Sequence, residues 1–346
     1  MKKLAIILII IFFAATPASA MDLTAPEAPE SAQKYFPEDT ESFADGLFYI
    51  LRTAIFSLKP EIKEAVTVCS GIIATVILGS FAGAFNEKNR QITNLVTVLV
   101  ISGLLLRSTD ALIQLGIRTV EEIVEYGKLL LPVMTTALAA QGGVSTSTAL
   151  FSLTSFVLNA ISVIATRLIV PIIYIYIALF ICTAIVNSSA LKNFQNFARW
   201  VITWTLKLSA YIFTGFISIT RAISGTVDAS ALKATKLTIS GVVPVIGNVI
   251  SDASETVLLS AGMLKNTAGV YGMLTILSVV IGPFLQIGVQ YLILKLTGGI
   301  CSMFSGEGTV EVVHNFTSAM GYILALLGTV CILLLISTVC FMKGIS

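Results

Sequence analysis

Apolar segments of membrane-spanning length follow one another along this chain and leave room for few other folds. Hydrophobic residues make up 56% of its 346 residues and charged residues only 12%, a composition that soluble globular domains do not show. One crossing takes about 20 apolar residues. We therefore expect spans at 65–85, 92–106, 149–166, 168–186, 200–219, 267–282, 284–300 and 318–341. The predicted fold class is all-α, a polytopic protein with about seven or eight transmembrane helices in a lipid bilayer.

The first residues have the composition of a cleavable secretory signal. Lys2 and Lys3 precede an apolar run at 4–15, and small residues occupy 18–20. We expect 1–20 to be a signal peptide cut after Ala20, with an uncleaved anchor as the alternative. The mature N-terminus would then lie outside the cytoplasm. The residues after the first span, Lys88 and Arg90, would be cytoplasmic, as the positive-inside rule prefers.

Two further segments precede the first span. Residues 21–46 hold seven acids against Lys34 as the one base, together with three prolines, and we expect a flexible acidic tail on the outer face. In 47–64 apolar residues recur at a spacing of three and four. This spacing predicts an amphipathic helix at the membrane interface, with a helix packed on the outer surface of the protein as the alternative.

Prolines and glycines indicate an internal repeat. Pro132 and Pro171 are 39 residues apart, as are Pro244 and Pro283, so one shift of 112 residues superposes both pairs. Gly103 falls on Gly215 under the same shift. Apolar blocks also coincide, which favours duplication over chance.

The shift divides the membrane part into unit 1 at 65–171, unit 2 at 172–283, and C-terminal spans at 284–346. Each unit has a weakly polar segment entered by a proline, at 129–145 and at 241–266. Since proline removes a backbone donor and disfavours helix before it, we expect re-entrant or broken helices there. If both segments dip in and return, the units are inverted, which is a design of transporters. If they cross fully, the units are parallel, and the sequence leaves both arrangements open.

Residues 241–269, here named the polar cassette, place ionisable groups among membrane segments. Its candidate passage residues are Pro244, Gly247, Asp252, Glu255, Thr256, Lys265, Asn266 and Gly269. Charges at bilayer depth are costly unless they face protein or water, so they commonly mark a functional interior. Alternatively, Asp252 and Glu255 complement the N-terminus of a helix that starts near Ser251, while Lys265 complements its C-terminus.

The same residues carry a resemblance to a known family. The string Pro244-Val245-Ile246-Gly247, the acidic stretch from Ser251 to Thr256, and Leu264-Lys265-Asn266 with Gly269 resemble the signature region of the stage III sporulation protein AE family. The signal peptide, the acidic tail, the multiple spans and the short end after the last span are similar as well. The resemblance covers most of the mature chain.

The resemblance implies a subunit of the sporulation stage III A complex, in the mother-cell membrane that faces the forespore. It implies a permease-like or channel-forming protein, needed for late forespore development, whose partners are an ATPase, smaller membrane subunits and ring-forming proteins. It supplies no catalytic residue and no substrate. The outer tail of this chain is short, so contacts on that face are not carried over.

Catalytic and cofactor chemistry has little support in the residues. His314 is the one histidine, and a metal site needs more ligands than its neighbourhood offers. The five cysteines form no CxxC pair, so we interpret them as apolar packing residues. A phosphate-binding glycine-lysine motif and a basic patch are both missing from the sequence. We therefore expect a protein that is not an enzyme, without cofactor, metal or nucleic acid.

Two kinds of function follow. A passage-forming subunit is favoured by the polar cassette and the repeat. A scaffold that docks other subunits is favoured by the few ionisable groups in the spans, mainly Arg167, Lys207 and Lys295. A generic secondary transporter is the alternative identity.

Overall fold

A computed structural model describes residues 25–37, 42–85, 90–141, 143–186, 188–223 and 247–343. Throughout these ranges the regular structure is helical, and none of them forms a strand. The helices are α2 (Glu30–Gln33), α3 (Phe43–Ser57), α4 (Lys59–Phe85), α5 (Arg90–Ala140), α6 (Val144–Val163), the π-helical η2 (Ile164–Ile169), α7 (Val170–Val186), α8 (Ser189–Ile223), α10 (Gly247–Cys301) and α11 (Glu307–Lys343). The signal peptide lies outside the described residues.

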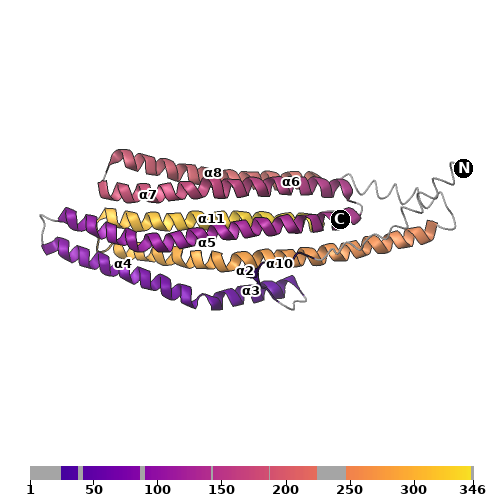
Figure 1. Cartoon of the computed structure of the whole chain (residues 1–346), viewed down its shortest axis with the longest axis horizontal. Helices are drawn as coiled ribbons and strands as arrows, with labels where there is room; N and C mark the ends of the chain where they lie inside the picture. Colours follow the sequence, from indigo (N-terminus) through magenta and orange to yellow (C-terminus); the bar gives the residue numbers. More distant parts are fainter. Residues whose placement is uncertain are drawn as a thin grey trace.

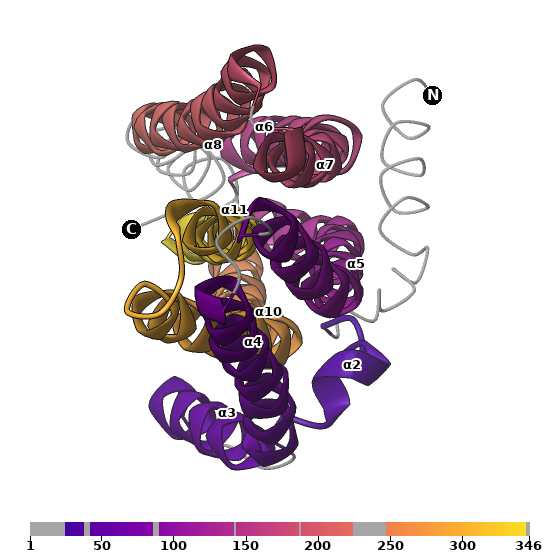
Figure 2. The ribbon, with the colours of Figure 1, turned by 90° about the vertical axis from the view of Figure 1, so that its left-hand side faces the viewer.

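The long helices form one elongated bundle (Figure 1). At one end, here named the loop end, α4 gives way to α5, α7 to α8, and α10 to α11. At the opposite end, the distal end, α5 gives way to α6, α10 begins and α11 finishes. Seen from the loop end, α11 lies between α10 and the α7–α8 pair, with α5 beside it (Figure 2). A central helix of this kind must be apolar on nearly all sides.

Within the residues that the structure describes, five helical stretches are long and apolar enough to cross a membrane: Lys59–Ala84, Arg90–Ala140, Val144–Val186, Asn266–Cys301 and Gly308–Met342. This confirms the predicted all-α class with membrane-spanning helices. Two expected pairs of spans are fused, since 149–166 and 168–186 are joined through η2, and 267–282 and 284–300 both belong to α10. The number of crossings remains a prediction.

Helix α5 continues through Pro132, where we had expected a re-entrant or broken helix, and α10 continues through Pro283, which we had placed between two spans. Pro132 lies inside the 51 residues of α5 and Pro283 inside the 55 residues of α10. Buried side chains lie close to both prolines, Leu131 and Met134 in α5, and Val280 and Ile287 about one turn from Pro283 in α10. Tertiary packing on both sides of the proline therefore outweighs its local preference against helix.

The segments that the shift of 112 residues superposes run in the same direction. Gly103 lies on α5 and Gly215 on α8, and both helices run from the loop end to the distal end (Figure 1). Pro171 lies on α7 and Pro283 on α10, which both run towards the loop end. Matched segments of an inverted repeat would run in opposite directions. The arrangement therefore favours parallel units, and duplication itself remains a prediction.

Glycines bring the central helices close together. A Cβ atom at Gly127 of α5 would lie 2.9 Å from Leu334 of α11, and one at Gly272 of α10 would lie 2.7 Å from Leu130 of α5. On the outer side, a Cβ at Gly79 of α4 would collide with Thr97 of α5. Close approach through small residues is how membrane helices gain packing energy without a hydrophobic drive.

The segment at 25–37 packs on the bundle, in contrast to the flexible tail expected for 21–46. The Phe36 and Tyr271 rings lie 4.7 Å apart, and Ser31 donates a 2.6 Å hydrogen bond to Glu122 of α5. Ala32 is fully buried. These apolar residues anchor the segment although acids surround them in the sequence. The expected helix at 47–64 corresponds to α3, which starts at Phe43, and the first turn of α4.

Candidate functional site

Two polar hollows open at the loop end of the bundle, on either side of α5. The first, of about 400 Å³, lies between α4, α5 and the α10–α11 connection and is lined by Gly79, Ser80, Arg90 and Asn94 among others. The second, of about 370 Å³, lies between α5, α7, α8 and α11. Asn94 lines both hollows. Polar hollows in an otherwise apolar bundle are the first candidates for a ligand path.

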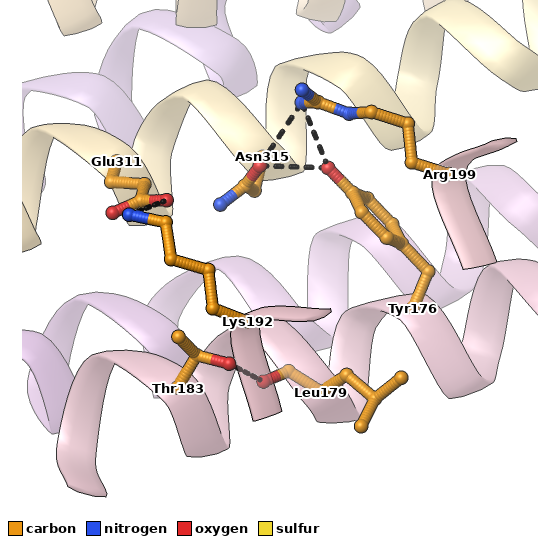
Figure 3. Close-up of polar contacts among 7 residues, drawn as sticks. All are labelled: Tyr176, Leu179, Thr183, Lys192, Arg199, Glu311 and Asn315. Carbon is orange, nitrogen blue, oxygen red and sulfur yellow. Dashed lines mark hydrogen bonds and ion pairs between the residues drawn. The ribbon is translucent and has the colours of Figure 1, made fainter. Parts of the chain in front are cut away.

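The second hollow contains an ion pair between α8 and α11. Lys192 Nζ lies 3.9 Å from Glu311 Oε1, and both side chains line the hollow. Both are about half exposed, at 58% and 44%. An exposed pair of this kind contributes little to stability. Thr183 of α7 lines the same hollow and donates its hydroxyl to the Leu179 carbonyl of its own helix (Figure 3).

A buried hydrogen-bonded cluster lies deeper between α7, α8 and α11. Tyr176 donates a 2.7 Å hydrogen bond to Asn315 Oδ1, and Arg199 Nη2 donates to both Tyr176 Oη and Asn315 Oδ1 at 3.3 Å (Figure 3). Tyr176 is fully buried and Asn315 is 3% exposed. Arg199 is half-buried, and its guanidinium also lies 6.0 Å from the Tyr176 ring centre. The cation is thus held by neutral oxygens and a ring face.

Aromatic rings close around this cluster. Phe180 and Tyr322 both meet the Tyr176 ring edge to face, at 5.4 and 5.9 Å between centroids, and Phe316 meets Phe180 at 4.8 Å. Such contacts exclude water, which strengthens the hydrogen bonds inside and makes an unpaired polar group more costly.

The polar residues of α8 and α11 form two facing rows, here named the polar seam. On α8 they are Lys192, Gln195 and Arg199, at a spacing of three and four, and on α11 they are Glu311 and Asn315. Residues at these spacings share a helix face. Gln195 is 4% exposed, and its Oε1 has no hydrogen-bond partner among the residues that the structure describes. The seam thus runs from the second hollow to the buried cluster and includes an unused acceptor.

Neither Arg199 nor Asn315 was a sequence-predicted site residue. The expected span began at Trp200, one residue after the arginine, and Asn315 was placed in a connector. The sequence signal that could have found them is the spacing of three and four between polar residues on each helix. It is combined with a basic residue, Lys192, near the start of α8 and an acidic residue, Glu311, near the start of α11.

The polar cassette lies at the distal part of α10, and the structure does not bring it to the seam. Gly247 is the first residue of α10, and Asp252, Glu255, Thr256 and Lys265 follow within the helix. Pro244 lies outside the described residues. The helix continues to Cys301, so Lys265 is far from a helix C-terminus, and Asp252 lies beyond the first turn. The alternative explanation, that these charges complement the ends of a helix, is therefore weakened, because the helix dipole acts mainly within the first and last turn.

The end of the cassette is a packing position. Asn266 is exposed, whereas Gly269 is buried. A Cβ at Gly269 would lie 2.6 Å from Met342 of α11 and 3.3 Å from Met134 of α5. By contrast, Gly103 and Gly215 face open space. A glycine at 269 is explained by contact between three helices.

Comparison with known proteins agrees with the resemblance found in the sequence. The profile of the family described as "Stage III sporulation protein AE" matches residues 38–344. The stage III sporulation protein AE of Bacillus subtilis (strain 168) is 23% identical over 266 residues, which cover 77% of this chain and 67% of that protein. No solved structure matches the chain significantly. The chain therefore belongs to the stage III sporulation protein AE family.

Proposed function

We propose that this protein is a permease-like subunit of the sporulation stage III A complex, in the mother-cell membrane around the forespore, and that the polar seam binds what it passes. The complex would also contain an ATPase and ring-forming subunits, which supply energy and an outer conduit. The observation that carries the proposal is the seam itself, which places Lys192, Glu311 and the Arg199 cluster between apolar helices. The exposed Lys192–Glu311 pair marks the open end of the seam, whereas Gln195 and the cluster around Arg199 are buried among apolar helices, where polar groups are costly to keep unless they serve a function.

Gln195 gives the proposal its test. A buried acceptor without a partner destabilises a fold, so replacing it by an apolar residue of similar size should leave stability unchanged or raise it. A passage, however, would lose a group that contacts the passing solute. We expect Gln195→Leu to reach the wild-type level in the membrane and still fail to support spore formation.

Ser278→Ala is the matched control, because Ser278 is also buried without a hydrogen-bond partner in the described residues but lies on α10. It should sporulate like the wild type. Normal spore formation by Gln195→Leu would contradict the passage.

A scaffold is the second candidate, favoured by the closed aromatic packing around Tyr176. A scaffold depends on the correct packing of the seam helices, and the free acceptor of Gln195 plays no part in it. The scaffold therefore predicts normal spore formation by Gln195→Leu. It also predicts that variants which disrupt the hydrogen-bonded cluster around Tyr176 lose partner subunits from the purified complex. Family membership favours both sporulation roles over a generic secondary transporter.

A further inference from the structure

Exposed side chains on α5 change character abruptly between Leu106 and Arg107. Towards the loop end, apart from Arg90, Gln91 and Asn94 in the first turns, they are the apolar Ile92, Val96, Leu99, Val100, Leu104 and Leu106 with Gly103. Towards the distal end they are Arg107, Asp110, Gln114, Arg118, Glu121, Glu125 and Lys128, with the apolar Ala111, Leu129, Pro132 and Ala140 among them. The same helix thus exposes an apolar face and then a charged one.

The continuous helix formed by α6, η2 and α7 changes at the same level. The exposed residues of its loop-end part are Leu168, Pro171, Ile175, Ala178, Cys182 and Val186, all apolar. The distal part exposes Ser145, Thr148, Ser152, Asn159 and Arg167 among the apolar Val144, Phe156 and Val163. The two helices are tied at this level, where Tyr174 donates a 2.7 Å hydrogen bond to Asp110.

Charged residues mark this level on two more helices. On α4 they are Lys63 and Glu64, and Glu64 shares a hollow with Ser108 of α5. On α8 the exposed Lys207 lies two turns beyond Arg199, next to the stacked and exposed Trp200 and Trp204. Tryptophan and basic residues gather where a bilayer meets water.

Four helices give the same thickness for the apolar band between this level and the loop end. At about 1.5 Å per residue, the band is about 26 Å thick along α5 from Arg90 to Arg107, and about 27 Å along α7 from Leu168 to Val186. It is about 27 Å from the start of α8 to Lys207, although the first two turns of α8 also expose Lys192, Asn193 and Asn196, and about 32 Å from Glu64 to the end of α4. The hydrocarbon core of a bilayer is about 30 Å thick.

We propose that the bilayer covers only this loop-end band, and that the distal half of the bundle stands in water as a stalk. The stalk extends about 50 Å along α5, from Arg107 to Ala140. The signal peptide expected at 1–20 would put the start of α4, and with it the stalk, on the outer side of the membrane. Basic residues do not decide the orientation, because Lys63, Arg107, Arg167 and Lys207 border the band on the stalk side and Arg90 and Lys192 border it at the loop end. Within the band, the exposed Lys295 lies over the Tyr291 ring, two turns from the loop end, within reach of the interface.

The opposite placement, with the bilayer over the distal half, would put the charged face of α5 from Arg118 to Lys128 in hydrocarbon. Only a cover of further protein could make that tolerable. A second copy or another subunit on this face inside the bilayer is therefore the competing arrangement, and accessibility to water distinguishes the two.

The test is cysteine labelling of the full-length chain in membranes with a bulky, membrane-impermeant maleimide, after replacement of the five native cysteines by alanine. Glu121→Cys on α5 and Ser152→Cys on α6 probe the stalk. Leu99→Cys and Ile175→Cys are the matched probes in the band, because the protein itself leaves about half of each side chain uncovered, at 50% and 54%. All four sites should react after denaturation in detergent.

We expect complete labelling of the two stalk sites from the non-cytoplasmic side and no labelling of the two band sites. A chain that keeps only the native Cys182 adds a check without a new cysteine, because the exposed Cys182 lies in the band and should stay unlabelled. Protection of both stalk sites, or reaction of the band sites and Cys182 in intact membranes, would overturn the placement. Because the seam is not altered, failure here leaves the proposed passage untouched.

Discussion

Tyr176 of α7 donates a 2.7 Å hydrogen bond to Asn315 of α11 across 139 residues of sequence. Arg199 of α8 donates to both oxygens, so three helices meet in one cluster. A half-buried cation held by neutral acceptors depends on every one of them, because removal of an acceptor leaves charge without compensation.

Asn315→Leu should therefore destabilise the protein strongly. It removes one of the side-chain oxygens to which Arg199 donates, and we expect a loss of about 1–3 kcal/mol, the range for an unsatisfied buried polar group. Tyr176→Phe keeps the ring and the Asn315 acceptor and should cost about 0.5–1.5 kcal/mol. Thermal unfolding of the purified protein in detergent measures both. The combination of Arg199→Met with Asn315→Leu should recover stability, and a single Asn315→Leu variant as stable as wild type would contradict this account.

Local sequence could not reveal this cluster. Arg199 precedes an apolar run and Asn315 follows a polar stretch, so each residue looked like a boundary. Their meeting depends on the register of three helices, which no spacing along the chain encodes. The apolar segments, by contrast, are recognised from their length and composition alone. For that reason the all-α membrane class could be predicted from the sequence.

For the prolines, the local sequence signal was clear, but the structure predicted from it was wrong. Local preference correctly marked Pro132 and Pro283 as unfavourable in helices, yet packing on both sides holds each helix continuous. A rule that works on single residues cannot weigh contacts from α11 and α5, which form only in the folded bundle.

Gly79 should be the sensitive position of α4. A Cβ there collides with Thr97, whereas a Cβ at Gly83 would lie 3.6 Å from Arg90 Cγ, an ordinary contact. We expect Gly79→Ala to cost about 1–3 kcal/mol through overpacking, and Gly83→Ala to stay within about 0.5 kcal/mol of wild type. Unfolding temperatures of the two variants give the comparison. Equal stability would show that α4 and α5 can separate freely, and Gly79→Ala combined with Thr97→Ala should recover part of the loss.

Pro132→Ala should stabilise the protein. The proline lies inside α5, exposed on the helix surface, where it removes a hydrogen bond and adds a steric clash worth about 3 kcal/mol. Alanine restores the donor without a larger side chain. We expect a higher unfolding temperature in detergent, with Ala111→Gly, at an exposed position in the middle of the same helix, as a control of opposite sign. A lower unfolding temperature for Pro132→Ala would mean that the bundle requires the kink.

The polar cassette yields the last prediction. Asp252, Glu255 and Thr256 lie three and four residues apart in one helix, so they share a face, and Lys265 lies about 15 Å beyond Glu255 along the axis. That separation excludes a direct pair, so each charge needs water, another subunit or a passing solute. If the cassette acts in passage, Asp252→Asn and Lys265→Met should abolish spore formation while the protein accumulates normally in the membrane. Leu258→Ala and Leu259→Ala are packing controls, expected to lower the protein level. Because Lys265 lies deep inside α10, a helix-dipole role would contribute less than about 0.3 kcal/mol there. Wild-type spore formation by both Asp252→Asn and Lys265→Met, at wild-type protein level, would remove the cassette from the mechanism and leave the seam as its remaining polar element.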